Sequence, residues 1–248
     1  MKAFMTNTKT ELYKLLCKKK YTVLTVLGAL IGLLVLGSYA LVAHLSNGEI
    51  QVKANLMMSM LRFVTDILVP LVVFMAVTDL FASEVQEDTF KAALTRPATR
   101  FKVMSAKAFA AFLIGCFSAL SVFVLSCIFQ LLFTGGGLNN IPFALASYLI
   151  DMIPVTALVS MALLINMLAK TPTFSLLMCI AVYVVFKCLN LYVSPIGQMI
   201  FTAYSGWHKI WLGTLQPFGS MLPKICILFG SVLILYSLSY IIFDREDY

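Results

Sequence analysis

The sequence predicts an all-α integral membrane protein with six transmembrane helices. The chain of 248 residues is 61% hydrophobic and 12% charged, whereas soluble domains are about 45–50% apolar. Its apolar residues form stretches long enough for a helix to cross a hydrocarbon core about 30 Å thick. Gly, Asn and Pro residues separate these stretches, whereas the strands of a β-barrel would alternate in units of about ten residues. These observations favour a helical bundle.

Six stretches have the length and hydropathy of membrane spans. The first and third are uncharged, the fifth contains only Lys187, and the sixth is uncharged up to Asp244. The second and fourth are interrupted by acids and prolines, which a bundle tolerates; these are Asp66, Pro70, Asp79, Asp151 and Pro154. The predicted spans, in a single transmembrane domain of residues 1–248, are about 21–43, 63–81, 108–133, 143–169, 174–193 and 225–243.

Basic residues are distributed unevenly between the two sides of the predicted bundle. If the N-terminus is cytoplasmic, 13 of the 18 Lys and Arg residues fall in inner segments, as expected of short cytoplasmic loops. The others are Lys53, Arg62, Lys187, Lys209 and Lys224. An even number of spans returns the C-terminus to the cytoplasm. Anionic membrane lipid then accounts for the net charge of +7, and no nucleic-acid partner is required.

Residues 5–20 predict a short amphipathic helix ahead of the first span. Thr8 and Glu11 have the spacing of a capping box at a helix start. Leu12, Leu15 and Leu16 fall on one face of that helix. We expect the helix to lie along the inner membrane interface.

The segment 194–223, between the fifth and sixth spans, is rich in aromatic and apolar residues. It contains Met199, Ile200, Phe201, Tyr204, Trp207, Trp211 and Phe218, including both tryptophans of the chain. Amphipathic rings favour the headgroup level, so short re-entrant or interfacial helices are expected here. Trp207 and Trp211 can serve as an aromatic anchor or as a gate that closes an outer exit.

A few ionisable residues lie near membrane depth, where such residues are rare and usually face a bundle interior or a cavity. Arg62 and Asp66 are four residues apart and are expected to pair on one helical face. Lys187 can extend to the headgroups or line a path. Asp151, close to Pro154, can face a cavity at a broken helix or mark the outer interface.

Motifs for catalysis do not stand out. The sequence has no Gly-x-x-x-x-Gly-Lys-Ser/Thr phosphate cradle and no Gly-x-Ser-x-Gly or His-Glu-x-x-His pattern. His44 and His208 have no carboxylate or cysteine at ligand spacing. The prediction is therefore a chain that is not an enzyme and has no catalytic, cofactor or metal site of its own.

The polar segment 79–107 separates two apolar spans. Its beginning lacks Pro and Gly and can be helical, whereas Pro97 disfavours helix at Arg96, so a bend is expected within a loop of about 82–104. One limb carries Glu84, Glu87, Asp88 and Thr89, and the other carries Arg96, Arg100 and Lys102. This pattern suits a charged groove of a partner protein. A solvated loop that follows the positive-inside rule is the alternative, but that rule does not predict the acids.

This segment resembles the cytoplasmic loop of ABC transporter permeases of the ABC-2 type, whose pattern is roughly Phe-Ala-x-Glu, Gly-Thr-x-Lys, Leu-Thr-x-Pro-x-Ser/Thr-Arg and Lys. The matching residues are Phe81-Ala82-Ser83-Glu84, Thr89-Phe90-Lys91, Leu94-Thr95-Arg96-Pro97-Ala98-Thr99-Arg100 and Lys107. Asp88 departs from the pattern, where Gly is common. Glu11 to Lys14, ahead of the first span, is also similar to the family.

The resemblance implies a permease subunit without an ATPase, paired with a second permease copy as a homodimer or heterodimer. Two copies of a cytoplasmic ATP-binding subunit would hold ATP and Mg. The loop after the second span would be a coupling helix, the N-terminal helix an elbow helix. The implied ATPase contacts are Glu84, Glu87, Asp88, Thr89, Arg96 and Arg100. In its small size the chain resembles bacterial plasma-membrane permeases that export amphipathic peptides or confer resistance to peptide antibiotics.

Two other functions fit the same features. A membrane scaffold or sensor would recruit a cytoplasmic partner through the same loop without transport. A secondary transporter would use Lys187 and Asp151, but it should also show an inverted repeat, and none is evident.

Overall fold

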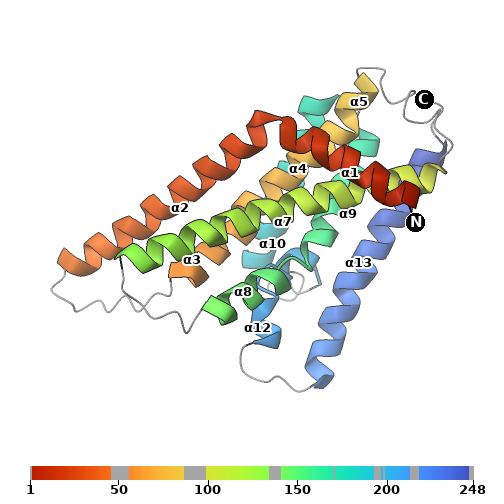
Figure 1. The fold of residues 1–248 in the computed structure, drawn as a ribbon. Helices are drawn as coiled ribbons and strands as arrows, with labels where there is room; N and C mark the ends of the chain where they lie inside the picture. Colours follow the sequence, from red (N-terminus) through yellow and green to blue (C-terminus); the bar gives the residue numbers. More distant parts are fainter. Residues whose placement is uncertain are drawn as a thin grey trace.

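The computed structural model describes residues 2–45, 56–86, 99–133, 141–169, 171–192, 197, 199–212 and 218–245. Within these residues every regular element is a helix (Figure 1). The helices up to residue 86 are α1 (Lys2–Cys17), α2 (Lys19–Leu45), α3 (Leu56–Phe63), the π-helical turn η1 (Val64–Leu68), α4 (Val69–Leu80) and α5 (Ala82–Gln86). The later ones are α7 (Arg100–Phe133), α8 (Ile141–Ile150), α9 (Val155–Leu168), α10 (Pro172–Tyr192), the 3-10 helix η3 (Phe201–Tyr204), α12 (His208–Trp211) and α13 (Phe218–Arg245).

Five helical stretches of the described residues are long and apolar enough to cross a membrane. They are Met57–Gln86, Arg100–Gln130, Ile141–Leu168, Pro172–Tyr192 and Gly219–Arg245. These stretches correspond to the second through sixth predicted spans. The first predicted span, 21–43, falls on α2, a helix of 27 residues. The structure describes the backbone of this helix but not all of its later side chains. The structure therefore shows five candidate spans among the described residues, and a sixth span, on α2, stays a prediction.

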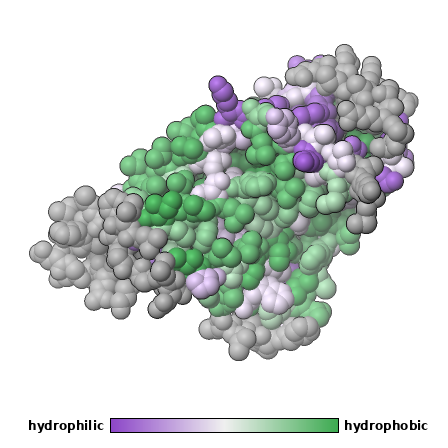
Figure 2. Space-filling view, in the orientation of Figure 1, coloured by the Kyte–Doolittle hydropathy of each residue, from purple (hydrophilic) through white to green (hydrophobic). Residues whose placement is uncertain are grey.

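The two ends of the bundle differ in polarity. Helices α1 and α5 and the last residues of α13 lie at one end, here called the α1 end, while α12 and the start of α13 lie at the other, the α12 end (Figure 1). Figure 2 shows a broad hydrophobic surface between these ends, with hydrophilic residues gathered at the α1 end. This arrangement matches a bundle whose middle faces hydrocarbon and whose α1 end faces water.

Several helix boundaries differ from the prediction. Helix α7 begins at Arg100, eight residues before the predicted span that starts at 108, and Lys107 within it is buried rather than solvated. Helix α1 begins at Lys2, so Thr8 lies inside it. The Thr8 hydroxyl donates to the Phe4 carbonyl oxygen at 3.0 Å, and the predicted capping box is therefore wrong.

Two glycines let α2 approach its neighbours closely. A Cβ atom on Gly28 would lie 2.3 Å from Cδ1 of Leu68, and one on Gly32 would lie 2.7 Å from the Met60 sulfur. Gly28 and Gly32 are four residues apart and share a face of α2, the small-x-x-x-small spacing that allows close packing of membrane helices. In contrast, a Cβ on Gly37 would meet no atom of the described residues within 4 Å.

Candidate functional site

A buried lysine organises the α1 end. The side chain of Lys107 on α7 is 0% exposed. Its Nζ donates to the carbonyl oxygen of Leu80 at 2.8 Å and to Oε2 of Glu84 at 2.5 Å, and Oε2 of Glu11 lies 4.0 Å away. A buried ammonium group is stable only when it is paired and hydrogen-bonded in this way. One charge thereby joins α1, the end of α4, α5 and α7.

A second ionic group ties the corner between α1 and α2 to α4. The carboxylate of Asp79 accepts hydrogen bonds from Lys18 at 3.1 Å, from Lys20 at 2.6 Å and from the Tyr21 hydroxyl at 2.7 Å. Lys18 stands at the bend between α1 and α2, so Asp79 holds that bend against α4. The direction in which α1 leaves the bundle is set by these contacts.

Lys14 connects the two carboxylates of the cluster. Its Nζ lies 3.1 Å from Oε2 of Glu11 and 3.3 Å from Oε1 of Glu84. Partial burial lowers the pKa of Lys14, but the attraction of the Glu11 and Glu84 carboxylates is larger in sum, and the net pKa is raised. Lys14 therefore stays charged at neutral pH and can hold α1 against α5. We call Glu11, Lys14, Glu84 and Lys107 the lysine cluster.

The residues expected to contact an ATPase fall into two groups. Glu84 belongs to the lysine cluster, and its side chain is 13% exposed, so it braces the start of the loop from within. Arg100 donates from Nη1 to the Asp244 carbonyl oxygen at 2.8 Å, which joins the start of α7 to the end of α13. The remaining predicted contacts lie outside the described residues, and they are Glu87, Asp88, Thr89 and Arg96. The coupling helix thus stays a prediction.

Asp66 and Lys187 meet at the α12 end. Asp66 lies in the π-helical turn η1, and its Oδ1 is 2.6 Å from Nζ of Lys187 on α10. Lys187 also donates to the Ser205 hydroxyl at 3.0 Å. The predicted pairing of Asp66 with Arg62 is wrong, because Lys187 on the facing helix takes the carboxylate. Lys187 therefore anchors α10 and the segment before α12 to η1.

The fourth span is broken where the sequence places Asp151 and Pro154. Proline cannot donate a backbone hydrogen bond, and α8 ends at Ile150 while α9 begins at Val155. Asp151 at this break is 2% exposed. Its Oδ1 accepts the backbone N–H of His208 at 2.6 Å, and its Oδ2 lies 2.7 Å from Nδ1 of His208.

The contact with His208 corrects the interpretation of both residues. His208 has no carboxylate near it in the sequence, yet Asp151, 57 residues earlier, holds its ring and its backbone. Asp151 is buried, so it does not lie at an open interface, and it borders a small void at the broken helix. It fixes the start of α12 against the break between α8 and α9.

The two tryptophans differ in environment. Trp207 is 1% exposed, and its ring packs edge-on against Tyr204 with 5.6 Å between centroids. Trp211 is 49% exposed. The structure has short helices in this segment, as the sequence predicted, namely η3 and α12. Trp207 is part of the core, so only Trp211 has the exposure expected of an anchor or a gate.

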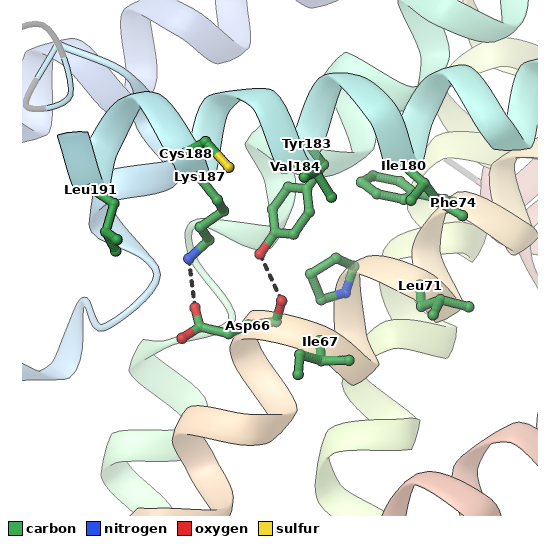
Figure 3. Close-up of a pocket in the computed structure, with 11 residues that line it drawn as sticks. Asp66, Ile67, Leu71, Phe74, Ile180, Tyr183, Val184, Lys187, Cys188 and Leu191 are labelled. Carbon is green, nitrogen blue, oxygen red and sulfur yellow. Dashed lines mark hydrogen bonds and ion pairs between the residues drawn. The ribbon is translucent and has the colours of Figure 1, made fainter. Parts of the chain in front are cut away.

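Cavities surround the Asp66–Lys187 pair. An apolar groove of about 370 Å³ runs between η1, α4 and α10, and a more polar cavity of about 800 Å³ opens beside it toward the segment before α12. Asp66, Lys187 and Leu191 line both, and Figure 3 shows them around the apolar groove. Asp151 and Lys187 also line a small void of about 20 Å³. The structure thus brings the predicted pathway residues to one end of the bundle, although Lys187 and Asp151 form separate pairs.

Apolar helices long enough to cross a bilayer, with polar clusters at the ends of the bundle, define a multi-pass integral membrane protein. From residue 8 to residue 187 the sequence matches the family described as "ABC-2 family transporter protein", and the chain belongs to this family. It is the membrane permease component of a transporter and lacks an ATPase site; ABC-2 permeases work with ATP-binding subunits. No curated protein sequence matches the chain.

Proposed function

We propose that this permease exports amphipathic or hydrophobic cargo, with peptides or peptide antibiotics as the first candidates, across a bacterial plasma membrane. The observation that supports a transport role is the family match from residue 8 to residue 187, which includes the whole lysine cluster. The peptide class is supported by the small size of the chain and by its resemblance to peptide-exporting permeases.

The proposed complex contains two permease copies and two ATP-binding subunits that hold ATP and Mg. Its α1 end faces the cytoplasm. The polar surface at that end, which α1, α5 and the end of α13 share, supports this orientation (Figure 2). The positive-inside distribution of Lys and Arg supports it independently.

The loop that follows α5 is the proposed docking element for the ATPase. Glu87, Asp88, Thr89 and Arg96 make the contact, while Glu84 braces the loop at its start and Arg100 at its end. Closure of the ATP-binding subunits would then push on a segment whose two ends are both fixed to the bundle. Because the lysine cluster joins α1, α5 and α7, a push on α5 moves these helices together.

Co-purification tests the docking role. A tagged chain, extracted from its native cells in mild detergent, is expected to retain an ATP-binding subunit in equal amount. The double variant Glu87→Lys/Asp88→Lys should lose that subunit, whereas Lys9→Glu, a charge reversal on an exposed position of α1, should retain it. Glu84 is unsuitable for this test because its loss would disturb the lysine cluster. Equal recovery with the double variant would overturn the docking role.

Drug susceptibility tests the cargo. Cells that produce the permease with its ATP-binding subunit are expected to tolerate several-fold more of a peptide antibiotic than cells in which that subunit cannot hydrolyse ATP. Trp211→Ala should reduce this tolerance if Trp211 gates the exit, while ATPase recovery stays unchanged. Equal susceptibility across a panel of amphipathic peptides would remove peptides as the cargo.

The alternatives gain no support from a specific contact. A secondary transporter was expected to use Lys187 and Asp151 together, but Lys187 pairs with Asp66 and Asp151 with His208. A scaffold would share the docking loop. Transport that depends on ATP hydrolysis distinguishes the exporter from both.

A further inference from the structure

The cavity of about 800 Å³ at the α12 end carries more positive than negative charge. Arg62, Lys187 and Lys209 line it, and Asp66 is the acid among its described lining residues. Asp66 is already paired with Lys187 at 2.6 Å. Arg62 and Lys209 form no ion pair with any residue that the structure describes. Two cationic groups thus have no ion-pair partner there, although the charge of Lys209 also acts on the buried Asp151.

The groove of about 370 Å³ beside this cavity is apolar. Its walls come from two membrane-spanning helices, η1–α4 and α10, and its lining includes Ile67, Leu71, Phe74, Ile180 and Val184 (Figure 3). Ile67 and Val184 are each at least half exposed, so the groove opens sideways at bilayer depth. An acyl chain lying in it would pack against these side chains in place of bulk lipid or detergent.

The cavity and the groove are continuous. Both are lined by Asp66, Lys187 and Leu191, so a ligand with two unlike parts can occupy the two spaces at once. The cationic part suits a phosphate group, because Arg and Lys donate charge-assisted hydrogen bonds to its oxygens. The apolar part suits an acyl chain.

We propose that this composite site binds an anionic phospholipid, with its phosphate between Arg62 and Lys209 and one acyl chain in the groove between α4 and α10. A cationic head would meet two unpaired positive charges, and a free anion would leave the groove empty. The site goes beyond the proposed export function, since binding requires neither ATP nor an ATP-binding subunit. A tryptophan-containing segment borders the cavity through Gly206, His208 and Lys209, which provides a direct readout.

Intrinsic fluorescence of the purified full-length chain tests the proposal. The chain has two tryptophans: Trp207 lies between the lining residues Gly206 and His208, and Trp211 follows the lining residue Lys209 by two positions. Dioctanoyl phosphatidylglycerol is titrated in neutral detergent and compared with dioctanoyl phosphatidylcholine and with inorganic phosphate. Phosphatidylglycerol is expected to bind at least tenfold more tightly than the other two probes, and its affinity should fall as salt is raised.

Charge variants locate the site. Arg62→Gln/Lys209→Gln should weaken phosphatidylglycerol binding about tenfold. Arg62→Lys/Lys209→Arg, which keeps both charges, should retain most of it. Lys19→Gln/Lys102→Gln removes two exposed lysines elsewhere and should bind like the wild type. Thermal unfolding midpoints establish that each variant is folded. If Arg62→Gln/Lys209→Gln fails to fold, the Arg62→Lys/Lys209→Arg variant still tests whether the two positive charges are enough for binding.

Three results would overturn the proposal. Equal affinity for phosphatidylglycerol and phosphatidylcholine, or wild-type affinity in the Arg62→Gln/Lys209→Gln variant, would remove the anionic site. Equal affinity for inorganic phosphate and phosphatidylglycerol would show a free-anion site without a role for the groove. A dibutanoyl phosphatidylglycerol probe checks the groove separately, because loss of buried methylenes should weaken binding more than tenfold.

Discussion

The Tyr183 hydroxyl lies 2.8 Å from the backbone carbonyl oxygen of Asp66, 117 residues earlier in the chain. Pro70 stands four residues after Asp66 and has no N–H to donate to that carbonyl. The π-helical turn at Val64–Leu68 directly precedes the helix that contains Pro70. Tyr183 thus provides a hydrogen bond that the proline cannot, and it joins α10 to the irregular part of the second span.

Replacing Tyr183 by Phe removes this hydrogen bond and keeps the ring. We expect a loss of about 1 kcal/mol in unfolding free energy, seen as a lower thermal unfolding midpoint in detergent. Tyr192→Phe is the matched control on the same helix, because Tyr192 is 83% exposed. If the two variants unfolded at the same temperature, the Tyr183 hydroxyl would have no part in holding η1.

A double-mutant cycle measures the pair between Asp66 and Lys187. Asp66→Asn and Lys187→Met should each destabilise the chain, and the double variant should lose less than the sum. A coupling of about 1 kcal/mol is expected, since both side chains are partly exposed and the pair is screened. The same cycle with Arg62→Met in place of Lys187→Met should give no coupling. Coupling to Arg62 instead would restore the pairing that the local spacing suggested.

Hydropathy predicted where the apolar helices lie, because a spanning helix must be continuously apolar over most of its length. It placed the fifth span at 174–193, and α10 runs from Pro172 to Tyr192. It misplaced the start of α7, because a lysine counts as solvated in any hydropathy sum. The buried charge of Lys107 is stabilised by Glu84, which belongs to another helix.

The contacts of the candidate site were harder to predict. Asp66 and Arg62 are four residues apart, and this local spacing suggested a pair, whereas the structure pairs Asp66 with Lys187 from 121 residues away. Asp151 and His208 are similarly distant in the sequence. One signal was present: Asp66 and Lys187 are opposite charges at membrane depth, where each is costly without a partner. Matching charges across spans would have found this pair.

Loss of Lys107 should be the most destabilising single change at the α1 end. Lys107→Met leaves the buried Glu84 carboxylate without its closest cation, and about 3–5 kcal/mol of unfolding free energy should be lost. Lys102→Met, at an exposed position of the same helix, should have little effect. Thermal unfolding measures both. Lys107→Met/Glu84→Gln should recover part of the loss, and no recovery would contradict the pairing.

Close packing of α2 depends on two glycines. Gly28→Leu would place side-chain atoms where Leu68 already lies and should cost about 1–3 kcal/mol through overpacking. Gly37→Leu is the control on the same helix, because its Cβ would meet no atom within 4 Å in the part of the chain that the structure describes. Unfolding midpoints of the two variants should differ by several degrees. Equal midpoints would mean that α2 does not pack on η1.

Replacing each tryptophan by alanine should affect the unfolding free energy to a different extent. Trp207→Ala removes a buried ring and should cost about 3–5 kcal/mol, while Trp211→Ala should change stability little. Emission spectra provide a second measurement, since the Trp211→Ala variant retains only the buried indole and should emit at shorter wavelength than Trp207→Ala. The reverse order of emission would place Trp207 at the surface.

Helix α7 is a long rod held firmly near one end. From Lys107 to Phe133 it extends for about 40 Å at the helical rise. A tilt of about 5° at the Lys107 end would displace the opposite end by about 3 Å, so a small rotation is amplified along its length. Spin labels on the last turns of α7 would therefore report, from across the membrane, movements that begin where Lys107 holds Glu84.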